Sequence, residues 1–131
     1  MADGWPFCSM SKHHYFGKYC EHRVIGELLK LNYDVALPIV DDRGVDCVIL
    51  KRDGKYIDLQ IKGRQPNWLF NIGKMIPRKN YFFMLVPPGG DIYVVPSKQL
   101  SIWLNGKPKV TLSGKKLNKY KGAYSLLTSS D

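Results

Sequence analysis

The stretch from Asp46 to Lys62 constrains the fold most, because it reads as two β-strands joined by a tight turn. Apolar and β-branched residues flank the pair Asp53-Gly54, a combination that is typical of a hairpin. Successive residues of a strand point to opposite faces of a sheet. The length of the turn therefore decides which side chains share a face, and a shift of one residue exchanges the two faces.

Two turn lengths are compatible with this hairpin. A two-residue loop would put Asp46 opposite Ile61, on the wrong side of the strand for Gln60. A three-residue loop with a left-handed Gly54 would put Asp46 opposite Gln60. We expect the second register, because it separates polar from apolar side chains. One face would carry Asp46, Val48, Leu50, Tyr56, Asp58, Gln60 and Lys62, and the other Val45, Cys47, Ile49, Ile57, Leu59 and Ile61.

Length and composition indicate one domain spanning residues 1–131. Hydrophobic residues make up 44% of the 131 positions, and a chain of this length can form a core without disulfides or structural metals. The three cysteines are odd in number and scattered, as expected for reduced thiols in a cytoplasmic protein. No secretory segment follows Met1, and no apolar run approaches the length of a membrane span. Paired zinc-ligand spacing is absent from the set Cys8, His13, His14, Cys20 and His22.

The charge is strongly positive and unevenly distributed. Twenty Lys and Arg residues against eleven acids give a net charge of +9. Twelve of the basic residues, but only one acid, Asp91, lie between Leu59 and Ser130. A basic surface beside an acidic pocket suits a polyanion held against a metal site, and the alternative is that the charge serves solubility alone.

A helix is predicted over residues 17–32 from an apolar stripe at three- and four-residue spacing. Glu21 stands at the first position of this stripe, where an unpaired buried carboxylate would be costly. It either sits at the wet rim of the core or faces something positive, such as a metal ion or Lys62. The stripe consists of Glu21, Val24, Leu28 and Leu31, widened by Ile25 and Leu29.

The rest of the chain is predicted to form short elements around this helix and hairpin. The turn at 87–90 joins two strands in a second hairpin, and Ser97 is placed to cap a short helix. The expected strands span 33–40, 68–72, 81–86, 91–95 and 110–112, the helix spans 97–104, and 119–127 packs back through Tyr120, Tyr124 and Leu127.

Four motifs follow one another between residues 17 and 64. They are Glu21 with Leu28 on the helix, Tyr33 opening the next strand, Gly44-Val45-Asp46, and Gln60-x-Lys62. Their order and spacing resemble those of the PD-(D/E)XK nuclease superfamily, in particular its small archaeal Holliday-junction-resolvase-like and endonuclease-domain branches. The later segment 81–104, with Val95-Pro96-Ser97, resembles the second branch less specifically.

The resemblance implies an α/β, restriction-endonuclease-like fold with a mixed sheet, flanking helices and an α-β-β-β core. It also implies hydrolysis of DNA phosphodiester bonds with Mg²⁺ or Mn²⁺. Asp46 would then be the principal metal ligand, completed by the side chain of Gln60 and the backbone carbonyl of Ile61. Lys62 would steer or activate the attacking water, and Glu21 would hold a metal-bound water from the helix.

Elementary chemistry agrees with these roles. Mg²⁺ takes oxygen ligands and keeps several waters, and a lysine adds positive charge where the phosphate becomes most negative. Gln60 departs from the commonest motif, which has Glu or Asp there, so metal affinity should fall and the site is active, weakened or inactive. Asp58 is either an outer-shell acid or a solvated strand residue.

Nucleic-acid contact is expected beside the mouth of this site. Trp68 and Phe70 are either core residues or platforms for bases. Phosphate contacts are assigned to Arg64, Lys74, Arg78 and Lys79, extended by the lysines of 107–121.

Three functions remain open from the sequence, because a fold alone does not fix function. The first is a metal-dependent DNA endonuclease, in which double-strand cutting would favour a homodimer. The second is a DNA-binding module that has lost the chemistry. The third is a structural subunit whose basic face binds an acidic protein.

Overall fold

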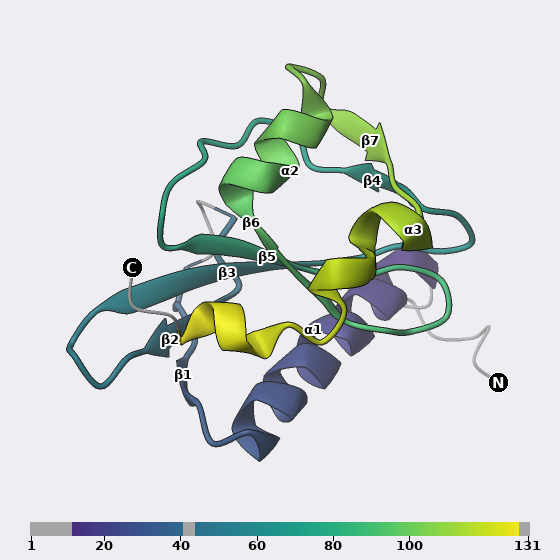
Figure 1. The fold of residues 1–131 in the computed structure, drawn as a ribbon. Coiled ribbons are helices and arrows are strands. Elements are labelled where there is room, and N and C mark those ends of the chain that lie inside the picture. The colour runs from purple at the N-terminus through teal and green to yellow at the C-terminus, as the bar shows by residue number, and fades with distance from the viewer. Residues whose placement is uncertain (1–11, 41–43, 129–131) are drawn as a thin grey trace, which may run out of the picture.

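The computed structural model describes residues 12–40 and 44–128. Its sheet has five strands in the order β1-β2-β3-β5-β6, in which only the central pair β3–β5 is parallel. Helix α1 covers one face, and α2 and the two-stranded ribbon β4–β7 lie on the other (Figure 1). The elements are α1 (Lys12–Lys30), β1 (Asp34–Ala36), β2 (Cys47–Leu50), β3 (Tyr56–Gly63), β4 (Leu69–Asn71), β5 (Tyr81–Val86), β6 (Tyr93–Pro96), α2 (Ser97–Leu104), β7 (Lys109–Thr111), α3 (Gly114–Leu117), η3 (Asn118–Tyr120) and η4 (Tyr124–Leu127).

The hairpin β2–β3 has the three-residue loop. Cys47 pairs with Leu59, which is the predicted register. At the turn the N–H of Lys51 donates to the carbonyl of Lys55 at 2.9 Å. Gly54 has φ of 86°, a conformation that favours glycine. The predicted separation of an apolar face from a polar face is thereby confirmed.

Two apolar cores lie on opposite faces of the sheet. The core under α1 is formed by alternate residues of β2 and β3 together with helix residues spaced four apart. The core on the other face lies between β5, β6, α2 and the ribbon. Members of the first include Cys20, Val24, Leu28, Cys47, Ile49, Ile57, Leu59 and Ile61, and members of the second include Phe70, Phe83, Leu85, Val95, Leu100 and Leu117.

Helix α1 begins earlier than predicted and ends at Lys30. Asn32 is left-handed with φ of 67°, and its N–H donates to the carbonyl of Leu29 at 2.9 Å. The N–H of Tyr33 donates to the carbonyl of Leu28 at 3.0 Å, which completes a Schellman motif. The chain therefore turns away before Leu31 can join the stripe, and this residue is 44% exposed. The predicted place of Leu31 in the stripe facing the core is wrong, and so is that of Leu29, which is 55% exposed.

Two further predictions need correction. The first strand covers only Asp34–Ala36 instead of 33–40, because its pairing with β2 ends where Ala36 lies opposite Val48 and Pro38 has no N–H to donate. Ser97 does not cap α2. Its hydroxyl is buried, accepts from the N–H of Arg78 at 3.0 Å and donates to the carbonyl of Arg78 at 2.9 Å.

The remaining elements lie close to their predicted positions. β5 and α2 have the predicted bounds, and β4, β6 and β7 differ by one or two residues. The tail returns to the sheet as predicted, with Tyr120 and Leu127 buried and Tyr124 packed against the first core. Among the described helices, none combines the length and apolar character needed to cross a membrane.

Helix α1 crosses the end of β3 in direct contact with Gly63. A Cβ atom at this position would overlap Sγ of Cys20 and lie 3.1 Å from Cε2 of Phe16. The absence of a side chain at Gly63 therefore sets how closely the helix approaches the strand.

We expect Gly63→Ala to lower the free energy of unfolding by about 1–3 kcal/mol, the usual cost of overpacking. Denaturant unfolding followed by circular dichroism measures this loss. Cys20→Ala in the same chain should restore part of it by removing the sulfur. Gly26→Ala is the control, since nothing lies within 4 Å of its added methyl group. Equal stability of Gly63→Ala and the wild type would contradict the described packing.

The two described cysteines are buried free thiols. Burial raises the pKa of Cys20 to about 11 and that of Cys47 to about 12, from an ordinary value of 9.0. At pH 8 both are protonated, and the thiolate is the reactive form. In a Cys8→Ser chain, we expect alkylation of both thiols to be at least on the order of 100-fold slower in the native protein than in guanidinium. Mass spectrometry of iodoacetamide adducts measures this, and rapid native labelling would contradict it.

Candidate functional site

The ladder between β2 and β3 ends at Asp46. Its N–H donates to the carbonyl of Leu59 at 2.8 Å, and its Oδ2 accepts the N–H of Ile61 at 2.7 Å. In a regular antiparallel continuation, the carbonyl of Val45 would accept the hydrogen bond from Ile61. A side-chain carboxylate thus takes the place of a backbone carbonyl, and β3 runs on to Gly63 without β2 beside it.

The carbonyl of Ile61 points toward the same end of the ladder. In an extended strand, the N–H and C=O of one residue face the same neighbour. The N–H of Asp58 donates to the carbonyl of Asn80, and that of Arg64 donates to the carbonyl of Val86. The backbone N–H and C=O groups of even-numbered residues in this stretch therefore face β5. The backbone groups of odd-numbered residues face the β2 side, and the carbonyl of Ile61 is therefore directed toward the side on which Asp46 lies.

Gln60 and Lys62 lie on the partly open face of β3. Their parallel partners on β5, Phe83 and Leu85, are fully buried beneath the second core. Gln60 and Lys62 are only partly buried, as is Asp46. The side chains of all three residues are therefore accessible to solvent.

The side chain of Gln60 is held between two groups from other segments. The hydroxyl of Tyr81 donates to Oε1 of Gln60 at 2.7 Å. A Cβ atom on Gly44 would lie 3.0 Å from the same oxygen, and Gly44 has φ of 72°. Both the close approach and the conformation require glycine here. Tyr81 is the residue that sequence reasoning missed, although its place at the start of a buried strand was a signal of proximity to the sheet centre.

Arg78 is engaged with the sheet surface. Its guanidinium pairs with the carboxylate of Asp58 at 2.8 Å and lies 4.4 Å from the ring centre of Tyr81. Both ends of the ion pair remain partly exposed, so its contribution to stability is small. Arg78 nevertheless contacts both Asp58 and the ring of Tyr81, whose hydroxyl in turn donates to Gln60.

The other predicted nucleic-acid contacts have different surroundings. Nε of Arg64 donates to Oδ1 of Asn67 at 3.2 Å, and the side chains of Lys74 and Lys79 are exposed. Phe70 is 1% exposed and belongs to the core, so it is not a platform for bases. Trp68 is partly buried and lies edge-on to Tyr93, with ring centres 6.3 Å apart.

Glu21 approaches this end of the sheet from the helix side. It follows Cys20, which crosses Gly63, and its carboxylate lies 3.4 Å from Nζ of Lys18. Burial is the main cause of the raised pKa of Cys47, and the carboxylates of Asp46 and Glu21 raise this pKa further. Both acids therefore act on the pKa of the same buried thiol, that of Cys47, although they belong to different segments of the chain.

The oxygen atoms at the ladder end suit a hard divalent cation. Within the described residues, no three His, Cys, Asp or Glu side chains converge on one point. The available donors are the carboxylate of Asp46, the amide oxygen of Gln60 and the carbonyl of Ile61. An all-oxygen set with one charge fits Mg²⁺ or Mn²⁺ that keeps several waters, and not a four-coordinate zinc site.

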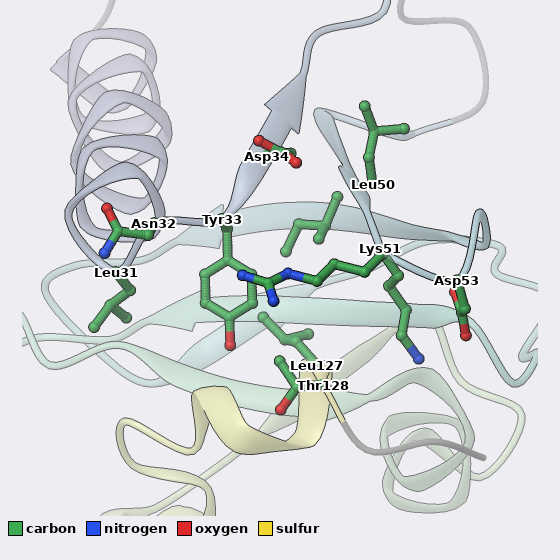
Figure 2. A pocket seen from close by; sticks show the side chains of 11 residues that line it. Leu31, Asn32, Tyr33, Asp34, Leu50, Lys51, Asp53, Leu127 and Thr128 are labelled. Carbon is green, nitrogen blue, oxygen red and sulfur yellow. The ribbon is translucent and has the colours of Figure 1, made fainter.

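A separate groove lies at the turn end of the same hairpin. It is lined by the end of α1, the β2–β3 turn and η4, and Figure 2 shows Tyr33 between Asn32 and Thr128 in this groove. Lys51 and Asp53 border it on the hairpin side (Figure 2). Four residues of β2 separate this end from Asp46, roughly 13 Å along a strand. The groove is therefore distinct from the candidate site.

Comparison with known proteins identifies a similar fold. Neither protein-family models nor curated protein sequences give a match to the chain. Among solved structures, the fold is similar to that of a bacterial homing endonuclease, I-Ssp6803I, with a TM-score of 0.65 and 17% sequence identity. The similarity covers 89% of this chain and 93% of that one. The chain thus has a mixed α/β fold that is shared with a nuclease.

Proposed function

We propose that this protein is a DNA endonuclease that hydrolyses phosphodiester bonds with the help of Mg²⁺ or Mn²⁺. The observation that carries the proposal is the end of the β2–β3 ladder, where the carboxylate of Asp46 accepts the N–H of Ile61, the residue between Gln60 and Lys62. The fold shared with a homing endonuclease and the net charge of +9 support DNA as the substrate. Membership of the PD-(D/E)XK superfamily is part of the proposal.

Each residue has a separate task in this mechanism. Asp46, the Oε1 atom of Gln60 and the carbonyl of Ile61 would hold the divalent ion. When bound, such an ion lowers the pKa of a water ligand and offsets the charge on the phosphate. The ammonium group of Lys62 stabilises the negative charge that develops on the phosphate oxygens. Glu21 accepts a hydrogen bond from a water on the helix side.

The duplex would be held mainly by contacts with its phosphates. Arg64, Lys74 and Lys79 follow the end of β3 in the sequence. Their positive charges would bind phosphates, a contact that does not depend on base identity. Arg78 would have to exchange Asp58 for a phosphate, so its proposed contact is the weakest of the four. One small site per chain cuts one strand, and a homodimer would supply the second site.

A second candidate function is DNA binding without cleavage. Among the described residues, no group of three or more His, Cys, Asp or Glu side chains that could hold a metal forms at Asp46, and Gln60 would contribute an uncharged oxygen. This arrangement would retain the basic surface while binding a cation weakly. Wild-type protein that binds duplex DNA with strong salt dependence, yet leaves it intact in Mg²⁺ and in Mn²⁺, would establish this function instead.

Lys62→Ala should lower the rate of DNA cleavage by at least about 100-fold, because a fixed charge near the reacting phosphate is lost. DNA affinity should change little, since one of twenty basic residues is removed. Nicking of supercoiled plasmid and gel-shift titration measure the two quantities. Lys98→Ala removes an exposed lysine on α2 and is the control for charge. Cleavage that survives Lys62→Ala, or is lost equally in the control, would rule out the assigned role.

Gln60→Glu should raise the affinity for Mn²⁺ by about tenfold, since a second negative charge joins Asp46. Asp46→Asn should lower this affinity while its amide oxygen still accepts the hydrogen bond from Ile61. Calorimetric titration with Mn²⁺ in the absence of DNA measures both changes. The control is Gln99→Glu, because Oε1 of Gln99 also faces a tyrosine hydroxyl, that of Tyr120. Weaker binding by Gln60→Glu would argue against Gln60 as a ligand.

A further inference from the structure

The ribbon β4–β7 presents a polar face away from the core. Hydrogen bonds join Ile72 to Pro108 at 2.9 Å and Leu112 to Trp68 at 3.0 Å, and Phe70 lies opposite Val110 between them. Phe70 and Val110 point into the second core. By the alternation of a strand, the two pairs on either side of them point outward. These pairs are Asn71 with Lys109 and Leu69 with Thr111.

The outward pairs are close cross-strand neighbours. They alternate with the hydrogen-bonded pairs of the ribbon, and residues in such non-hydrogen-bonded pairs have their side chains nearest to one another. Asn71, Lys109 and Thr111 are exposed, and Leu69 is half-buried. The face therefore combines an amide, an ammonium group, a hydroxyl and methyl groups.

Lysines flank this ribbon in the sequence. Lys107 is exposed beside β7, and Lys115 and Lys116 are exposed shortly after it. Between residues 59 and 128 the chain carries one acid, Asp91, and its carboxylate lies 3.4 Å from Nζ of Lys121. The charge of the ribbon and its flanks is complementary to a polyanion.

The dimensions of the ribbon match the major groove of B-form DNA. That groove is about 12 Å wide and admits a two-stranded β-ribbon. Side-chain pairs two residues apart are separated by roughly 6.8 Å along a strand, the rise of about two base pairs. The major groove of A-form RNA is deep and narrow and excludes side chains from the base edges. The ribbon therefore suits DNA and not duplex RNA.

We propose that the outward face of β4–β7 reads two neighbouring base pairs in the major groove, so that the protein prefers particular DNA sequences. The proposal rests on the DNA endonuclease function above. Asn71 would donate to N7 of adenine and accept from its N6 amino group in a bidentate contact, and Lys109 would donate to O6 and N7 of guanine. Leu69 and the methyl group of Thr111 would contact the methyl group of thymine.

The ribbon is within reach of the same duplex as the candidate site. The five residues 64–68 connect the end of β3 to the start of β4. Fully extended, the chain from Lys62 to Leu69 spans at most about 25 Å. A phosphate at Lys62 and base edges at Leu69 can therefore belong to one duplex, within about one turn of its helix.

The test is selection from a randomised DNA duplex library by the full chain carrying Lys62→Ala, which removes the proposed cutting. This protein should enrich a short motif. Addition of Asn71→Ala should lower the preference for the enriched base at one position roughly 10- to 100-fold, and addition of Lys109→Ala should do so at an adjacent position. Lys98→Ala removes the same charge from α2 and should lower the affinity for all sequences slightly and equally while keeping the motif. Duplex RNA should compete poorly.

The outcomes separate this proposal from the proposed function. A motif that persists in both ribbon variants, or salt-dependent DNA binding without any motif, would overturn base reading by the ribbon and leave the endonuclease function standing. Equal competition by duplex RNA would also overturn it. Failure of the Lys62→Ala protein to bind duplex DNA at low salt would instead overturn the proposed function, and the base-reading proposal with it.

Discussion

The hydrogen bond from the N–H of Ile61 to the carboxylate of Asp46 is the contact on which the arrangement of the site depends. A partly buried N–H without a partner would cost about 1–3 kcal/mol, so a sheet cannot simply stop in its interior. The carboxylate satisfies that donor and allows β2 to leave β3. The same carboxylate thereby ends the hydrogen-bond ladder between β2 and β3 and places a negative charge at that end. Gln60 and Lys62 follow on the strand that continues beyond it.

The register of the hairpin could be predicted because the turn is short and the side chains alternate. Once Gly54 ends a three-residue loop, the period of two fixes which side chains of β2 and β3 share a face, from Cys47 with Leu59 to Leu50 with Tyr56, without any tertiary information. The helix was less predictable. The spacing test for zinc ligands says nothing of how Cys20 packs, and its small buried side chain fits against Gly63. The three- and four-residue spacing of the stripe likewise does not reveal that Asn32 reverses the chain.

The contacts that surround Gln60 could not be predicted, because they cross between parallel strands. Parallel pairing requires a long connection, so no turn sets the register that brings Tyr81 opposite Asp58 and leaves its hydroxyl against Gln60. The same limit applies to β4 and β7, whose partners lie about forty residues apart in the sequence. Each strand could be recognised by its composition. Their pairing, and therefore the face that the ribbon exposes, depends on packing against the second core.

An amide in place of a carboxylate at position 60 has a physical advantage when no cation is bound. The carboxylate of Asp46 binds the N–H of the next residue, Ile61, so a carboxylate at position 60 would place like charges on neighbouring strands, which destabilises a sheet by a few tenths to about 1 kcal/mol. Gln60 avoids this repulsion, and its oxygen accepts a hydrogen bond from the neutral hydroxyl of Tyr81. The cost is a weaker attraction for a divalent ion. In the proposed endonuclease, this arrangement would favour a sheet that is stable before an ion binds, and the basic residues of the second half of the chain would supply much of the attraction for DNA.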